Sequence, residues 1–295
     1  MISLPVLAAA ALAVMPDAAM PEPRPVVPSD TSPCDAPCED DVVADPAAVG
    51  AADAGPILRA IAPLDERQAS GLAALGGFTL SANAALASQY RYRGTNLSGD
   101  RIAVQGGLDL DHASGFYVGV WGSTLDGRRT GYGDVELDIY AGYTAPVIEG
   151  VTADLGVIAY TFPDAPVGGR DFVELTAALT ASLGPARAKV GAAWDPGAGG
   201  FAFAGFVRDN LYVYSDVSVG IPATPLTLKA HLGYTGGTRR LATNSGSFDW
   251  SVGASYAVFG PVSASLEYVD AGADVRQGLF NPNSGNLVAR ISVNF

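Results

Sequence analysis

DVELDIYAGYT, the stretch from Asp134 to Thr144, alternates between two kinds of side chain. Its odd-numbered positions carry Val, Leu, Ile, Ala and Tyr, whereas its even-numbered positions from 136 onward carry Glu, Asp, Tyr, Gly and Thr. Successive side chains of a β-strand point to opposite faces, so this stretch predicts a strand with one apolar and one polar face. Apolar side chains facing lipid and polar side chains facing inward are typical of a transmembrane β-barrel.

The same alternation recurs along the chain, which predicts an all-β protein: a transmembrane antiparallel β-barrel of about twelve strands with a disordered N-terminal tail. The strands are expected at residues 78–93, 101–112, 115–125, 134–145, 150–161, 171–183, 186–195, 209–221, 225–235, 248–259, 262–270 and 286–295. Short connections alternate with longer ones, as the periplasmic turns and outer loops of bacterial barrels do. With an even number of strands, both ends of the barrel are expected on the periplasmic side.

The rows expected to face lipid lack Asp, Glu, Lys and Arg in their clearest examples, which lie in residues 151–157, 226–232 and 287–293. A Lys or Arg near the bilayer midplane on such a face would cost roughly 2–4 kcal/mol. A soluble β-sandwich shares the alternation, but the strand number and the loop lengths favour the barrel. Aromatic residues near the strand ends suggest interfacial girdles, namely Tyr90, Tyr92, Tyr143, Tyr234, Trp250, Tyr256 and Tyr268.

The N-terminal part differs in composition from the rest of the chain. Residues 1–19 resemble a secretory signal peptide without its usual basic residues. Residues 20–77 form the predicted acidic, Pro- and Ala-rich disordered tail, with a short helix or a frayed linker at 57–75. Residues 1–77 hold 11 of the 30 acidic side chains, so much of the net charge of −13 belongs to this part and not to residues 78–295, the expected barrel. No basic surface suggests nucleic-acid binding.

No enzyme, cofactor or metal site is expected. Cys34 and Cys38 could pair as a local disulfide, but no further Cys or His near them completes four metal ligands. The two histidines, His112 and His231, accompany no recognisable nucleophile motif.

The polar rows predict the lining of a pore. The candidate residues are Arg91, Arg93, Gln105, Asp109, Glu136, Asp138, Tyr140, Asp154, Glu174, Arg187, Lys189, Asp216, Lys229, His231, Glu267 and Arg290. Their charges either sort solutes in a water-filled channel or pair with one another in a closed lumen. Counted with Asp111, Asp249 and Arg101, inward acids outnumber bases by nine to seven, which predicts a weak preference for cations.

Several motifs resemble those of the TorF-type porin family of proteobacteria. They are ASQYRYRG at 87–94, AVQGG at 103–107, SGFYVGVWGS at 114–123, ELDIYAGY at 136–143, YTFP at 160–163 and VEL at 173–175. The resemblance covers roughly 78–295 and implies a barrel in the bacterial outer membrane. The ending ISVNF is similar to the signal that the outer-membrane assembly machinery reads, with Phe295 as its last residue.

We therefore expect an outer-membrane porin-like channel for passive diffusion of small hydrophilic solutes through a narrow charged lumen. Its expected partners are the lipid bilayer, the assembly machinery and those solutes. The alternative is a non-conducting barrel that has a structural role or binds a ligand or partner.

Overall fold

The structure is a computed structural model that describes residues 73–165, 171–196, 210–237, 246–272 and 280–295. The predicted signal peptide and the Cys34–Cys38 disulfide lie outside these residues. The helix suggested at 57–75 lies largely outside them as well. Its last three residues are described, and they form the short strand β1 (Ala73–Leu75), which pairs with the start of the next strand.

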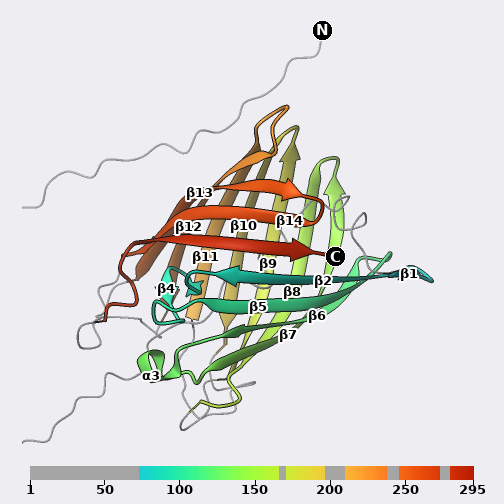
Figure 1. The fold of residues 1–295 in the computed structure, drawn as a ribbon. Helices are drawn as coiled ribbons and strands as arrows, with labels where there is room; N and C mark the ends of the chain where they lie inside the picture. The colour runs from blue at the N-terminus through green and yellow to red at the C-terminus, as the bar shows by residue number, and fades with distance from the viewer. Residues whose placement is uncertain (1–72, 166–170, 197–209, 238–245, 273–279) are drawn as a thin grey trace, which may run out of the picture. The chain divides into compact units, whose positions relative to one another are not determined.

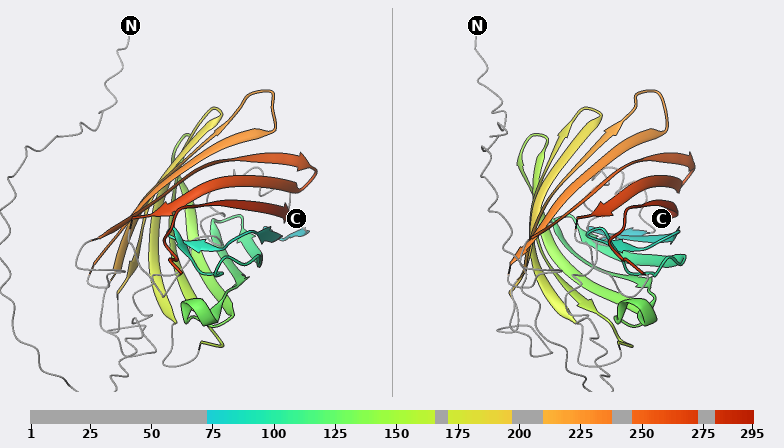
Figure 2. Two further views of the ribbon diagram at one scale, coloured as in Figure 1. Left: turned by 60° about the vertical axis from the view of Figure 1, so that its left-hand side comes forward. Right: turned by 90° about the vertical axis from the view of Figure 1, so that its left-hand side faces the viewer.

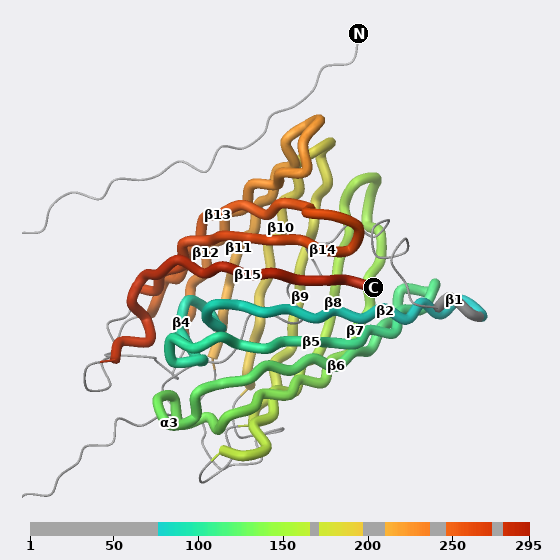
Figure 3. The backbone as a smooth tube through the Cα atoms, viewed as in Figure 1, coloured from blue at the N-terminus to red at the C-terminus, as the bar shows by residue number. Residues whose placement is uncertain are grey.

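A single antiparallel sheet of 13 strands closes into a barrel (Figure 1). Apart from β1, its twelve strands are β2 (Phe78–Ala87), β5 (Ala103–His112), β6 (Phe116–Thr124), β7 (Val135–Ile148), β8 (Val151–Thr161), β9 (Phe172–Leu183), β10 (Ala186–Asp195), β11 (Asn210–Gly220), β12 (Leu226–Gly237), β13 (Ser247–Phe259), β14 (Val262–Ala271) and β15 (Asn286–Asn294). Each strand pairs with the next, and β2 pairs with both β5 and β15, which closes the wall (Figure 3). The predicted twelve-stranded barrel is confirmed.

The two ends of the barrel carry connections of different length. The turns between β7 and β8 and between β13 and β14 span only two residues, and the backbone of Phe295 pairs with Ala82 at that same end. The connections at the other end are longer, from 88–102 to 272–285. The short turns favour glycine. Gly184, in the turn between β9 and β10, has a φ of +59°, a backbone conformation that is strained for a residue with a side chain.

The outer face of the wall is apolar. Leu86, Ile139, Leu155 and Leu232 are each at least 50% exposed, and comparable side chains repeat along every strand of the barrel. Asp270 is an exception: it shares the outward parity of Leu266 and Tyr268, but it lies at the loop end of β14. No helix among the described residues is long and apolar enough to cross a membrane.

The predicted aromatic girdle is partly wrong. Tyr143, Tyr234, Trp250, Tyr256 and Tyr268 are exposed on the outer face as expected, with exposed fractions between 36% and 49%. Tyr90 and Tyr92 instead have almost no exposed surface, because their part of the chain leaves the wall.

The first long connection lies inside the barrel, whereas residues 78–93 were expected to form one continuous strand. The wall strand β2 ends at Ala87, and the chain then forms a small two-stranded sheet of β3 (Arg91–Tyr92) and β4 (Thr95–Asn96), seen within the curved wall in Figure 2. Arg93 and Gly94 both have positive φ and turn the chain between these strands. We call residues 88–102 the inserted loop. The short helix α3 (Gly127–Thr130) lies in the next long connection.

Candidate solute pathway through the barrel

The inserted loop is fixed to the wall by a buried ion pair. Nη2 of Arg93 donates to both carboxylate oxygens of Glu174 on β9, each at 2.8 Å, and both side chains are at most 3% exposed. The guanidinium also lies 4.0 Å from the ring centroid of Tyr212 on β11 and 4.7 Å from that of Tyr92. One arginine thereby holds the tip of the loop against two wall strands.

Burial and charge act in opposite directions on Arg93. Burial lowers its pKa, but the carboxylate of Glu174 and the neighbouring tyrosines outweigh that effect and leave the pKa above its usual value. Tyr90, whose hydroxyl donates to Oε1 of Glu136 at 3.1 Å, has a raised pKa because of its burial and the nearby carboxylates Glu136 and Asp138. The loop therefore presents a cation and a neutral donor to the acidic side chains of the wall.

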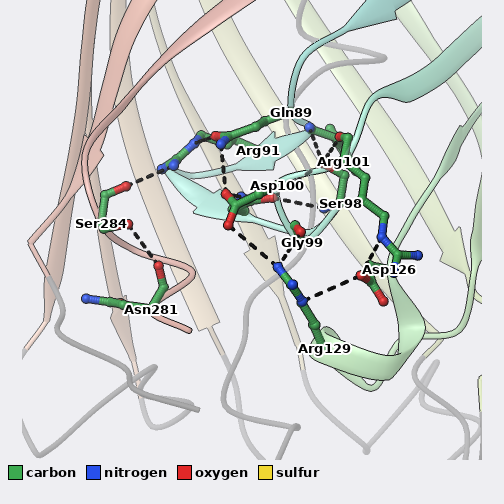
Figure 4. A network of polar contacts seen from close by, with 12 residues as sticks. Gln89, Arg91, Ser98, Gly99, Asp100, Arg101, Asp126, Arg129, Asn281 and Ser284 are labelled. Carbon is green, nitrogen blue, oxygen red and sulfur yellow. Dashed lines mark hydrogen bonds and ion pairs between the residues drawn. The ribbon is translucent and has the colours of Figure 1, made fainter. Parts of the chain in front are cut away.

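A polar network holds the base of the inserted loop, as Figure 4 shows. Arg91 donates to the backbone oxygen of Gly94 at 2.7 Å and to that of Ser284, in the connection before β15, at 2.8 Å. It also donates to Gln89, whose amide nitrogen in turn donates to Asp100.

The same network reaches α3 in the neighbouring connection. Arg129 donates to the backbone oxygen of Gly99 at 2.6 Å, and Arg101 lies 3.2 Å from Asp126 (Figure 4). The inserted loop is thus bound at its tip and at its base. Arg101 was counted among the inward bases, but it lies in this loop and its side chain is 59% exposed.

The inserted loop covers one side of the lumen. We call Glu136, Asp138 and Glu174 the acidic wall; these side chains of β7 and β9 are at most 1% exposed. Rings from the loop and the wall pack over this region, with the centroids of Tyr90 and Trp121 at 5.5 Å and those of Tyr92 and Tyr160 at 6.3 Å. This side of the lumen is therefore a packed core and not an open surface.

The other side of the lumen contains a cavity of about 190 Å³. We call Arg187, Lys189, Lys229 and Arg290, which project into it from β10, β12 and β15, the basic wall. Of the described acidic side chains, Asp216, Asp249 and Glu267 reach this cavity, whereas those of the acidic wall do not line it. The cavity also takes lining from the inserted loop through Gln89, Tyr90, Arg91, Arg93 and Gly94.

A histidine joins two of these carboxylates. Nδ1 of His231 lies 2.6 Å from Asp216, and Nε2 lies 3.0 Å from Asp249 and 2.9 Å from the hydroxyl of Tyr212. That hydroxyl also donates to Asp249 at 3.0 Å. The cluster spans β11, β12 and β13 and keeps two of the cavity's carboxylates engaged. Among the described residues, no group of three or more His, Cys, Asp or Glu side chains could hold a metal ion.

The structure places the predicted lining residues in four environments. Arg91 and Arg93 belong to the inserted loop and not to a wall strand. Glu136, Asp138, Tyr140 and Glu174 point inward and are buried beneath or beside that loop, as is Asp109 nearby. The wall residues that line the cavity are Gln105, Arg187, Lys189, Asp216, Lys229, His231, Glu267 and Arg290. Asp154 lies outside that lining and accepts hydrogen bonds from Tyr117 and Thr144. Their part in conduction stays a prediction.

Two residues of the inserted loop, Gln89 and Tyr90, line the cavity without having been predicted to do so. Their alternation with Arg91 and Tyr92 imitates a continuing strand, and only the Arg93–Gly94 turn signals that the chain reverses.

Several solved structures resemble this chain in fold but share little sequence identity with it. The KdgM porin is 11% identical with a TM-score of 0.49, over 73% of this chain and 98% of that chain. The NanC porin is 12% identical with a TM-score of 0.49, over 74% and 99%. The COG4313 outer membrane channel from Pseudomonas putida F1 is 15% identical with a TM-score of 0.41, over 80% and 100%. Likenesses of this degree do not identify a function.

Among curated proteins, no significant match was found. The chain matches one protein family, described as "Bacterial protein of unknown function (Gcw_chp)". This description does not contain the TorF-type name, which therefore stays a resemblance. The match spans residues 72–289, most of the chain and almost all of the barrel, and the chain therefore belongs to this bacterial family.

Proposed function

We propose that this protein is an outer-membrane channel through which small hydrophilic solutes diffuse passively. The observation that carries the proposal is one closed wall with opposite faces: apolar side chains outside and a cavity with charged lining inside. A closed barrel leaves no strand edge unpaired, which is a requirement for β-structure that crosses a bilayer.

The outer face supports the membrane location. Soluble monomers rarely expose contiguous apolar patches larger than a few hundred Å². Here exposed Leu, Val, Ile and aromatic side chains follow the strands around the barrel, and tyrosines such as Tyr143 and Tyr256 belong to the same face. Bacterial β-barrels of this type lie in the outer membrane.

The inserted loop supports a narrow channel. Barrels of about eight strands are filled by their own side chains, whereas those of 16–18 strands leave a wide aqueous pore. This barrel lies between these sizes, and the inserted loop with its buried tyrosines fills part of its lumen. A cavity of about 190 Å³ lies beside the basic wall.

Planar-bilayer recording tests the proposal. Purified refolded protein should give discrete current steps smaller than those of a wide trimeric porin recorded in the same salt. Protein denatured by heat before addition serves as the control. A barrel that is folded by its heat-modifiable migration on a gel, yet gives no steps, would contradict the channel and favour a non-conducting barrel.

A further inference from the structure

We infer that the cavity beside the basic wall is a binding site for anionic solutes, so that the protein selects small carboxylates or phosphates over cations. This inference rests on the proposed channel function and names the class of solute for its lumen. It reverses the weak cation preference that the inward charges predict when they are counted from the sequence alone.

The cavity lining carries more basic than acidic side chains. Among the residues that the structure describes, six basic side chains reach the cavity: Arg91, Arg93, Arg187, Lys189, Lys229 and Arg290. Three acidic side chains of the same described segments reach it: Asp216, Asp249 and Glu267. Without Arg93, which is bound to Glu174, five bases still face three acids. A solute that enters this space meets a net positive lining.

The carboxylates of the cavity are engaged by neighbouring groups of the wall. Asp216 and Asp249 both contact the ring of His231, and Asp249 also accepts from Tyr212. Glu267 lies close to the wall, because a Cβ added to Gly253 would lie 2.4 Å from the Glu267 Cγ. The contacts with His231 and Tyr212 weaken the competition of Asp216 and Asp249 with a solute for the basic side chains.

Hydroxyl and cationic donors lie next to one another in the wall of the cavity. The strand register sets Arg187 beside Ser218 and Ser218 beside Lys229, while Arg290 lies beside Ser265. Ser218 and Ser265 both line the cavity, so hydroxyl donors alternate with cationic ones. Guanidinium groups match the planar oxygens of carboxylates and phosphates, and lysines add compact positive charge.

The inserted loop separates the acidic wall from the cavity. The acidic wall holds three inward carboxylates on β7 and β9, and the inserted loop covers it with Arg93, Tyr90 and Tyr92. A packed tyrosine layer keeps a solute from contacting these carboxylates. The cavity beside the basic wall holds on the order of ten water molecules, which is room for a small organic acid or a phosphate.

Reversal potentials in a KCl gradient test the inference. The parent channel should be more permeable to chloride than to potassium. The double variant Lys229→Gln with Arg290→Gln should lower that permeability ratio about threefold, because it removes two unit charges within a few ångströms of the path. Arg128→Gln is the matched control, since it removes a positive charge from an exposed position on α3 and should leave the ratio unchanged.

Two further variants have defined effects on the permeability ratio. Glu267→Gln removes a cavity carboxylate and should raise the chloride preference, which also keeps the test valid if the double variant does not fold. Glu136→Gln with Asp138→Asn removes two carboxylates of the covered acidic wall and should change the ratio little. A parent channel that prefers potassium, or one whose ratio responds to the acidic wall and not to Lys229 and Arg290, would overturn the inference while leaving the channel intact.

A binding measurement separates this inference from the channel itself. Calorimetric titration of the detergent-solubilised barrel with citrate should show saturable binding that the double variant weakens and Arg128→Gln does not. If the bilayer stays silent and citrate binds, the channel proposal fails and the anion site stands. If citrate does not bind and no chloride preference is found, the anion site is refuted.

Discussion

At the scale of single residues, Arg93 and Glu174 hold the tip of the inserted loop against the wall. Breaking a buried ion pair by removing one partner typically costs about 3–5 kcal/mol, because the other charge remains buried without compensation. Glu174→Gln should therefore release the tip of the loop from β9. Trypsin should then cut the folded barrel after Arg91 or Arg93, at bonds that are protected in the parent, and mass spectrometry would identify the cut.

Asp154→Asn is the matched control for that experiment. It also removes an inward carboxylate, but Asp154 contacts Tyr117 and Thr144 rather than the inserted loop. Equal cleavage of the parent and of the Glu174→Gln variant would show that this pair does not hold the loop.

Gly94 lies where the inserted loop meets the end of β14. Its φ is +79°, and an added Cβ would lie 2.6 Å from the Cβ of Ala271 and 3.0 Å from the backbone oxygen of Asp270. Gly94→Ala should therefore combine a backbone cost of roughly 1–2 kcal/mol with a steric clash. We expect the heat-modifiable band to convert at a lower temperature than in the parent.

Gly184→Ala separates the two causes. Gly184 has a φ of +59°, but nothing lies within 4 Å of its added Cβ, so only the backbone cost applies. If both variants convert at the same temperature, the close approach of Gly94 to β14 contributes nothing to stability.

At the scale of elements, shortening the inserted loop should widen the channel. Ala87 and Ala103 are paired neighbours on β2 and β5, so a short Gly-Ser turn in place of residues 89–101 could join the two strands. Removal of the loop uncovers the acidic wall and takes Arg91 and Arg93 out of the lumen. Single-channel conductance should rise, and the chloride preference should fall as Glu136, Asp138 and Glu174 become accessible.

Heat-modifiable migration on a gel must first show that the shortened barrel is folded. An unchanged conductance from a folded barrel would mean that the narrowest part of the path lies elsewhere than at the inserted loop.

The twelve wall strands were predictable, whereas the inserted loop was not. The boundaries of β10 coincide with those expected, and those of β8 and β9 differ by one residue at one end. Apolar alternation sets these strands locally, because one of their faces must meet an apolar environment. The path of residues 88–102 depends instead on Glu136, Glu174 and Ser284, which are distant in sequence, so no local period encodes it.

The same difference of scale explains the candidate site. Inward parity could be assigned for Lys229 or Glu136 from the alternation alone. The alternation could not show which of these side chains lines the cavity, because the inserted loop covers one wall and leaves the other accessible. A count of inward charges therefore gave the opposite selectivity from the lining of the cavity.

At the scale of the whole molecule, the direction of the barrel in the membrane can be tested. The chain end at Phe295, the start of β2 and the shortest turns lie at one end, and the long connections lie at the other. In bacterial barrels the short turns are periplasmic and the long loops face outward. An epitope inserted between Thr243 and Asn244 should therefore bind antibody on intact cells, whereas one inserted at Ser114 or Gly260 should bind only after permeabilisation.

Each tagged protein must also show the heat-modifiable migration of a folded barrel, because a tag in a tight turn can disturb strand pairing. Labelling of Ser114 and Gly260, but not of the tag after Thr243, on intact cells would reverse the orientation and place the inserted loop at the periplasmic mouth.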